Sequence, residues 1–226
     1  PVAGTVESIR QIPPQTLYDC HKAFYTPSNM ILVCVGNLDP EQVIRTAEEL
    51  LPETGGPVIP RDYGQEESLF PVRQEYRRTM EVAMPMFLAG YKCRLQESGD
   101  AHLRQSIIGD LACDVLFGDS SPLYTRLYAE GAINGSLGGN FDLLPGAAYL
   151  YVGGDVKDPR RVFDAINAQA RRLGEEGIDR DFYEQIRRAS YGQMIRSLNS
   201  FENIAVSMTE GYFRNFFCRR GQVSSG

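Results

Sequence analysis

Residues 24–40 read FYTPSNMILVCVGNLDP, and this stretch sets the expected order of the first structural elements. Pro27 ends the preceding helix, because a proline ring does not fit inside a helix. Residues 30–35 are a short apolar run between turn residues, which is typical of a strand buried on both faces. Asp39 can cap the next helix, and Pro40 suits its first turn. The stretch therefore predicts a helix, a buried strand and a second helix.

The chain has 226 residues, which is enough for one large domain or two small ones. Residues 52–60, PETGGPVIP, are rich in Pro and Gly and are the best candidate for a linker. We therefore expect residues 1–60 to form a helix–strand–helix unit that either closes a preceding domain or completes the next one. We expect residues 61–218 to form a domain of mixed helices and strands, followed by a flexible polar tail at residues 219–226.

The second unit has a regular order of expected elements: two strands, two helices, two strands and two helices, with one more helical segment after them. The expected strands are residues 72–78, 82–91, 134–141 and 147–153, and the expected helices are residues 100–117, 122–128, 159–173, 179–198 and 201–217. Residues 144–146 read as the turn between the last two strands. This order is typical of an antiparallel β-sheet with helices packed on one face, the α+β class.

Composition excludes several functions. The net charge of −6 argues against a nucleic-acid partner, because phosphate binding requires clustered Lys and Arg. No apolar run approaches the roughly 20 residues needed to span a bilayer, so we expect no membrane partner. The scattered cysteines contain no Cys-x-x-Cys pair and mostly follow or precede apolar residues, which indicates buried free thiols in a reducing, cytoplasmic location. The five cysteines are Cys20, Cys34, Cys93, Cys113 and Cys218.

Two passages give the chain a family resemblance. Residues 24–40 and residues 121–131, SPLYTRLYAEG, resemble in order and spacing the second segment of pitrilysin/insulinase-like zinc metallopeptidases, which are related to mitochondrial processing peptidase. The resemblance covers nearly the whole chain and places residue 1 just after the zinc-binding domain of the family. It implies a fragment of the mitochondrial processing peptidase-like metallohydrolase fold.

The zinc motif of that family is absent from this chain. The motif, His-x-x-Glu-His, places two imidazoles on one helix face with a glutamate that activates water. His21 and His102 are the only histidines, and neither belongs to such a motif. We therefore expect no catalytic residue, no metal ligand and no cofactor here, with zinc in the upstream domain of an active parent. A site built from both histidines and carboxylates is the less favoured alternative.

A second departure concerns the oxyanion-stabilising pair. By resemblance, active second halves of the family supply an Arg and a Tyr that face the zinc. Tyr128 stands where the Arg would be, and Asn134 or Gly135 stands where the Tyr would be. This departure fits a zinc-bearing first half, whose second domain needs no such pair, or an inactive relative.

Residues 135–140, GSLGGN, are glycine-rich but lack the features of a phosphate loop. Glycine inside a strand indicates a bulge or the close approach of another chain. We favour strand curvature as the explanation. The alternative is a substrate-binding role in which Gly138, Gly139 and Phe141 contact a peptide.

The function we expect is that of a non-catalytic C-terminal domain of a zinc metallopeptidase. By resemblance, the parent cleaves peptides in a closed chamber, and this piece supplies part of the chamber wall and inter-domain contacts. Its expected partners are the peptide substrate and the second half or partner subunit of the chamber, and the chain alone is expected to be inactive. The alternative is a scaffold or assembly domain of a catalytically inactive family member.

Overall fold

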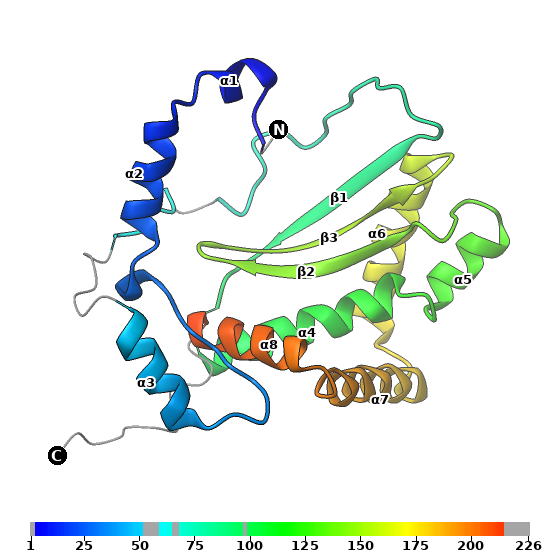
Figure 1. Ribbon diagram of the computed structural model, residues 1–226. Coiled ribbons are helices and arrows are strands. Elements are labelled where there is room, and N and C mark those ends of the chain that lie inside the picture. The colour runs from blue at the N-terminus through cyan, green and yellow to red at the C-terminus, as the bar shows by residue number, and fades with distance from the viewer. Residues whose placement is uncertain (1–2, 52–58, 65–67, 97–98, 215–226) are drawn as a thin grey trace. The chain divides into compact units, whose positions relative to one another are not determined.

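The computed structural model describes residues 3–51, 59–64, 68–96 and 99–214 (Figure 1). The chain divides into two compact units, residues 1–62 with 200–210 and residues 63–199 with 211–226. Helix α8 (Phe201–Phe213) runs from the first unit into the second. The predicted tail at residues 219–226 and most of the predicted linker lie outside the described residues, so the proposed domain boundaries stay a prediction.

The first unit consists of short helices. They are α1 (Val6–Arg10), α2 (Pro14–Phe24), the single 3-10 turn η1 (Pro27–Asn29) and α3 (Pro40–Leu50). Asp39 caps α3 as predicted, because its carboxylate accepts a hydrogen bond from the Glu41 amide at 3.0 Å. Pro40 occupies the first turn of α3, where its missing N–H has no helical partner to lose.

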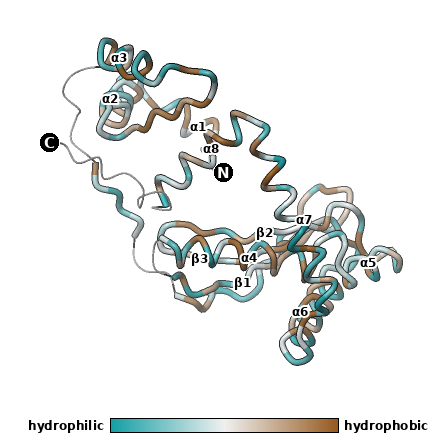
Figure 2. The backbone as a smooth tube through the Cα atoms, turned by 90° about the horizontal axis from the view of Figure 1, so that it is seen from below, coloured by the Kyte–Doolittle hydropathy of each residue, from teal (hydrophilic) through white to brown (hydrophobic). Residues whose placement is uncertain are grey.

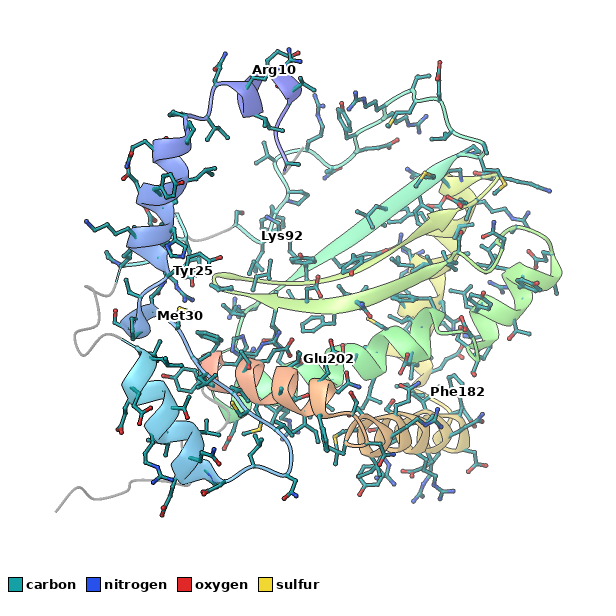
Figure 3. All side chains as sticks on the ribbon, in the orientation of Figure 1. Arg10, Tyr25, Met30, Lys92, Phe182 and Glu202 are labelled. Carbon is teal, nitrogen blue, oxygen red and sulfur yellow. The ribbon has the colours of Figure 1, made fainter. Side chains whose placement is uncertain are left out.

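Residues 30–35, predicted to be a buried strand, are extended but pair with no described strand. Met30, which follows Tyr25 along the chain in Figure 3, is 58% exposed, and Leu32 is 63% exposed. The alternating Ile31 and Val33 are half-buried. The prediction is wrong for this structure because a strand is completed by its neighbours, and the described part of the chain supplies none.

The second unit contains a three-stranded antiparallel sheet, which confirms the predicted α+β class. Its strands are β1 (Met86–Cys93), β2 (Gly138–Leu144) and β3 (Ala147–Asp155), in the order β1-β3-β2. The predicted turn joins β2 to β3, and Gly146 has a φ of 83° there, which a glycine adopts without strain.

Helices α4 (Asp100–Phe117) and α6 (Pro159–Glu176) cover one face of this sheet. Helices α5 (Pro122–Ala129) and α7 (Arg180–Ser197) pack against these helices. Helix α4 packs along β2, and α6 lies behind β1 (Figure 1). The Tyr91 hydroxyl of β1 donates to the Asn167 side chain of α6 at 2.9 Å. The side chains of the core are almost fully buried, among them Leu123, Leu127, Val152, Val156, Val162 and Ile166.

Two predicted strands need correction. Residues 72–78 form no strand, and β1 pairs with β3 instead of making a hairpin with them. Val72 is fully exposed, so nothing buries the apolar positions of that stretch. Strand β2 begins at Gly138 and not at residue 134. The reason is local, because the Asn134 side chain accepts a hydrogen bond from the Ser136 amide at 2.8 Å and forms a turn.

Helix α7 agrees with its predicted range, whereas the cysteines differ from expectation in part. The Asp179 carboxylate caps α7 by accepting a hydrogen bond from the Phe182 amide at 2.8 Å. Of the described cysteines, Cys113 is buried and Cys93 half-buried, whereas the two in the first unit are exposed. All four are free thiols.

A glycine of α4 allows close packing of this helix on the sheet. A Cβ atom placed on Gly109 of α4 would overlap the ring of Phe141 on β2. A Cβ on Gly139 would overlap the carbonyl oxygen of Tyr151, and it would lie 2.8 Å from the Phe117 ring. The Phe141 ring therefore rests directly on the backbone of α4.

Replacing Gly109 with alanine is expected to destabilise the chain by about 1–3 kcal/mol, because the added methyl forces the Phe141 ring or α4 to move. Denaturant unfolding followed by circular dichroism measures this change. Gly192→Ala is the matched control, since nothing lies within 4 Å of that position in α7. The free energy of unfolding of the control should rise by roughly 0.5–1 kcal/mol, because alanine has a higher helix propensity than glycine. A Gly109→Ala variant as stable as this control would contradict the packing described here.

Two carboxylates lie one turn apart on α4. The Ser190 hydroxyl donates to the Asp114 carboxylate at 3.4 Å. Burial raises the pKa of Asp110, and the neighbouring charge of Asp114 adds to the effect. Burial likewise raises the pKa of Asp114, although its bond with Ser190 opposes the shift. Both charged forms are therefore less favoured in the folded chain than in the unfolded one.

Asp110→Asn is expected to stabilise the chain at pH 7. The pKa of Asp110 is higher in the folded chain than in the unfolded chain. Asp110 therefore contributes favourably to the free energy of unfolding at a pH below its unfolded pKa, and this contribution is lost as the pH rises through its folded pKa. The gain from the substitution should therefore shrink as the pH falls toward 4. Urea unfolding at several pH values measures this dependence, with Asp155→Asn as a control. A gain independent of pH would show that titration of Asp110 is not its cause.

Candidate functional site

The open face of the sheet, opposite the helices, carries polar and aromatic side chains. The strand register arranges its side chains in rows across β1, β3 and β2. Three successive rows are Lys92–Tyr149–Asp142, Gly90–Tyr151–Asn140 and Leu88–Gly153–Gly138. Leu88 is 76% exposed, so this side of the sheet is not a second core.

Two tyrosines lie side by side on the central strand. The ring centroids of Tyr149 and Tyr151 are 6.1 Å apart, with their planes tilted by 44°. Tyr149 lies directly opposite Asp142 on the neighbouring strand. Desolvation raises the pKa of Tyr149, and the negative charge of Asp142 raises it further. Tyr149 therefore stays protonated at neutral pH, so its hydroxyl can donate a hydrogen bond.

Glycines form the floor beside these rings. Gly138 has no atom within 4 Å of a hypothetical Cβ, so its side of the sheet is open. A Cβ on Gly153 would lie 2.6 Å from the Phe87 carbonyl oxygen, so that strand crossing requires glycine. Gly90 is the β1 residue opposite Tyr151, so no side chain stands beside Tyr151 on its β1 side.

The three predicted peptide contacts do not share a face. Gly138 is exposed on the open face. Gly139 and Phe141 point to the helices, where Phe141 is 9% exposed and belongs to the core. Their substrate role stays a prediction, but the burial of Phe141 gives it a packing role. Sequence reasoning missed Tyr149, Tyr151 and Asp142, although the alternation of residues 148–152 already places both tyrosines on one face.

The two histidines lie in different units. His21 stacks on Tyr25 with ring centroids 4.8 Å apart on the exposed surface of α2. His102 lies in the first turn of α4, where its Nε2 atom is buried without a hydrogen-bond partner. Burial lowers the pKa of His102, and the charge of Arg214 lowers it further. Within the described residues, no three His, Cys, Asp or Glu side chains gather in a way that could hold a metal ion.

The positions compared with the oxyanion-stabilising Arg and Tyr carry uncharged side chains. Tyr128 is 58% exposed and stacks on Tyr124 with centroids 6.1 Å apart. Asn134 is exposed and its side chain is engaged in the local turn with Ser136. Neither residue offers the cationic group that an Arg would supply. In the described part of the chain, no helix is both long and apolar enough to cross a membrane.

Comparisons with known proteins agree with this arrangement. Residues 11–190 match the family model described as the Peptidase M16 inactive domain. The chain is 35% identical over 217 residues to a Bacillus subtilis (strain 168) protein named "Uncharacterized zinc protease YmfH". That match covers 94% of this chain and 50% of the relative.

Solved structures share the fold. A crystal structure of an M16-like protein from Alicyclobacillus acidocaldarius has a TM-score of 0.81 and 30% identity, covering 95% of this chain and 51% of its own. The crystal structure of a protease from Helicobacter pylori has a TM-score of 0.79 at 18% identity, covering 94% of this chain and 52% of its own. This second likeness concerns the fold alone. The chain thus spans about half the length of the relatives it matches.

The family model covers most of the chain, and the relative in Bacillus subtilis matches it at 35% identity over nearly its whole length. Together with the shared fold, these matches show that the chain belongs to the M16 family of pitrilysin-like peptidases, where it corresponds to the inactive domain.

Proposed function

We propose that this chain is the non-catalytic C-terminal part of a longer zinc-dependent metallopeptidase, where it forms part of the wall of a peptide-binding chamber. The observation that carries the proposal is the match of residues 11–190 to the inactive domain of the family. The relative named a zinc protease is about twice as long as the matched region, which leaves room for a separate zinc-binding half. The zinc would then be held by that upstream half.

The open face of the sheet is the surface we assign to the chamber. It presents Gly138, the exposed member of the three predicted contacts, beside the two tyrosines of β3. Aromatic rings, amide groups and uncovered glycine backbone are means of holding an extended peptide without cleaving it. The described residues supply no group of metal ligands beside them.

Residues 1–60 are best explained as the end of the preceding domain. None of the described residues 3–51 is buried, although α3 has an apolar side. Residues 30–38 and α3 border two apolar hollows of about 780 Å³ each, with Leu32, Leu38 and Val43 in both linings. A segment with so much uncovered apolar surface requires a partner to bury it. The sheet of the upstream domain is the partner we propose.

An inactive scaffold is the second candidate function. The specific observation that favours it is that Tyr128, with Asn134 or Gly135, stands where an active second half of the family would have an Arg and a Tyr. A zinc-bearing first half would need no such pair, so this observation alone does not decide between the two functions. The zinc content of the parent protein separates them.

Elemental analysis of the full-length parent is expected to find about one zinc per chain, whereas the 226-residue chain alone should contain none. A quenched fluorescent peptide mixture should be hydrolysed only by the full-length protein. Removal of zinc by a chelator should abolish hydrolysis, and added zinc should restore it. Zinc-free parent protein without peptidase activity would support the scaffold instead, and zinc bound stoichiometrically to this chain would contradict the proposal.

Leu32→Lys is expected to destabilise the parent protein by about 2 kcal/mol or more, because it places a charge where the proposed sheet buries a leucine. The same substitution should change the free energy of unfolding of the 226-residue chain by under about 0.5 kcal/mol, since Leu32 is 63% exposed there. Denaturant unfolding of both proteins measures the difference. Glu49→Lys, on the exposed side of α3, is the control. Equal effects of Leu32→Lys in both proteins would contradict burial by the upstream domain.

A further inference from the structure

Asp142 carries a charge that the described chain does not neutralise. The residue is half-buried on the open face of the sheet, next to Tyr149. The ion pairs among the described residues join other carboxylates to arginine, and none includes Asp142. A carboxylate partly removed from water is costly unless a cation or donors compensate it. Tyr149, the residue opposite Asp142, is neutral and leaves the negative charge in place.

The one lysine in the same row donates a hydrogen bond away from Asp142. Lys92 lies beside Tyr149 on β1, and its Nζ donates to the Ser68 carbonyl oxygen at 3.0 Å (Figure 3). Tyr149 stands between Lys92 and Asp142 in that row. The position beside Asp142 is thus available to a cation from outside the chain.

Two aromatic rings lie next to this carboxylate. The faces of tyrosine rings attract cations, and the attraction strengthens as the site loses water. The centroid separation of 6.1 Å between Tyr149 and Tyr151 is close to the spacing of successive side chains on one face of a strand. One long side chain can therefore contact the rings along its stem while its charged end reaches Asp142.

Two glycines near Tyr151, Gly138 and Gly90, provide room for such a stem. Gly138 is open on the β2 side and Gly90 carries no side chain on the β1 side, whereas the Leu88 side chain lies 3.0 Å from a Cβ placed on Gly153. Asn140, across from Tyr151, adds a neutral hydrogen-bonding group at the edge of the sheet. The floor is thus uncharged and lies between the Tyr151 ring and the Leu88 side chain.

We propose that Asp142, Tyr149 and Tyr151 form a subsite that binds the cationic side chain of a Lys or Arg residue in an extended peptide. That the ligand is a peptide rests on the proposed function, whereas the preference for a cation rests on the geometry of these three residues. The chain's net charge of −6 favours the approach of a cationic ligand. Arginine fits better than lysine, because its planar group can stack on a ring and still bond a carboxylate.

The test uses the 226-residue chain and four labelled eight-residue peptides that differ at one central position. That position holds Arg, Lys, citrulline or Glu, and fluorescence anisotropy measures each Kd at low salt. The Arg peptide should bind about 3–10-fold more tightly than the citrulline peptide, which keeps the shape and loses the charge. The Glu peptide should bind more weakly than either.

Three variants locate the effect. Asp142→Asn should remove the difference between the Arg and citrulline peptides, and Tyr151→Leu should reduce it. Asp155→Asn is the matched control, because Asp155 lies farther along β3 on the same face and should leave the difference unchanged. Thermal unfolding of each variant by circular dichroism confirms that the fold is kept.

Several outcomes would overturn the proposal. Equal affinity for the Arg and citrulline peptides would show that the face does not select a cation. Equal loss in Asp142→Asn and Asp155→Asn would indicate general charge attraction. Stronger binding of citrulline would identify a neutral aromatic platform, and no binding of any peptide up to millimolar concentration would reject the subsite.

These outcomes are distinct from those of the proposed function. A parent protein that contains zinc and cleaves peptides, with no dependence on Lys or Arg, keeps the proposed function and rejects the subsite. A zinc-free parent whose chain still prefers the Arg peptide keeps the subsite and rejects the peptidase.

Discussion

The contact between the Phe141 ring and the backbone of α4 at Gly109 is the constraint on which the second unit depends. It brings α4 closer to β2 than any residue with a side chain at position 109 would allow. Because side chains alternate along a strand, fixing Phe141 on the helix side places Asp142 on the opposite side. The antiparallel pairing of β2 with β3 then sets Tyr149 beside Asp142. The core contact and the open-face groups are thus two results of one strand register.

Sequence reasoning succeeded where structure is determined locally. Helix α4 has the predicted bounds, because its length is set by residues close in sequence: apolar side chains recur at helical spacing, and Gly118 follows its last residue. The turn before Ala147 was likewise predicted from its own residues.

Strands and the site were harder to predict because both depend on partners distant in sequence. Residues 72–78 alternate as a strand should, yet no neighbour pairs with them in the described chain. The open-face group needs the register between β2 and β3, which alternation within one strand does not give. The glycine-rich pattern suggested Gly139 as a peptide contact. In the structure, the missing side chain of Gly139 allows β2 to approach the Tyr151 carbonyl oxygen of β3 closely. A glycine-rich pattern alone does not distinguish packing from ligand contact.

The first unit shows the same dependence in a stronger form. Residues 30–35 have the composition of an inner strand, and their exposure alternates as a strand's would, but they form no ladder. Figure 2 shows hydrophobic residues along this connection between α2 and α3. The free energy gained by burying these residues is roughly proportional to their apolar area. It therefore favours binding to any surface that covers them. The uncovered apolar side chains of residues 30–35 therefore favour a partner surface, and the upstream sheet of the proposed function is one that would bury them.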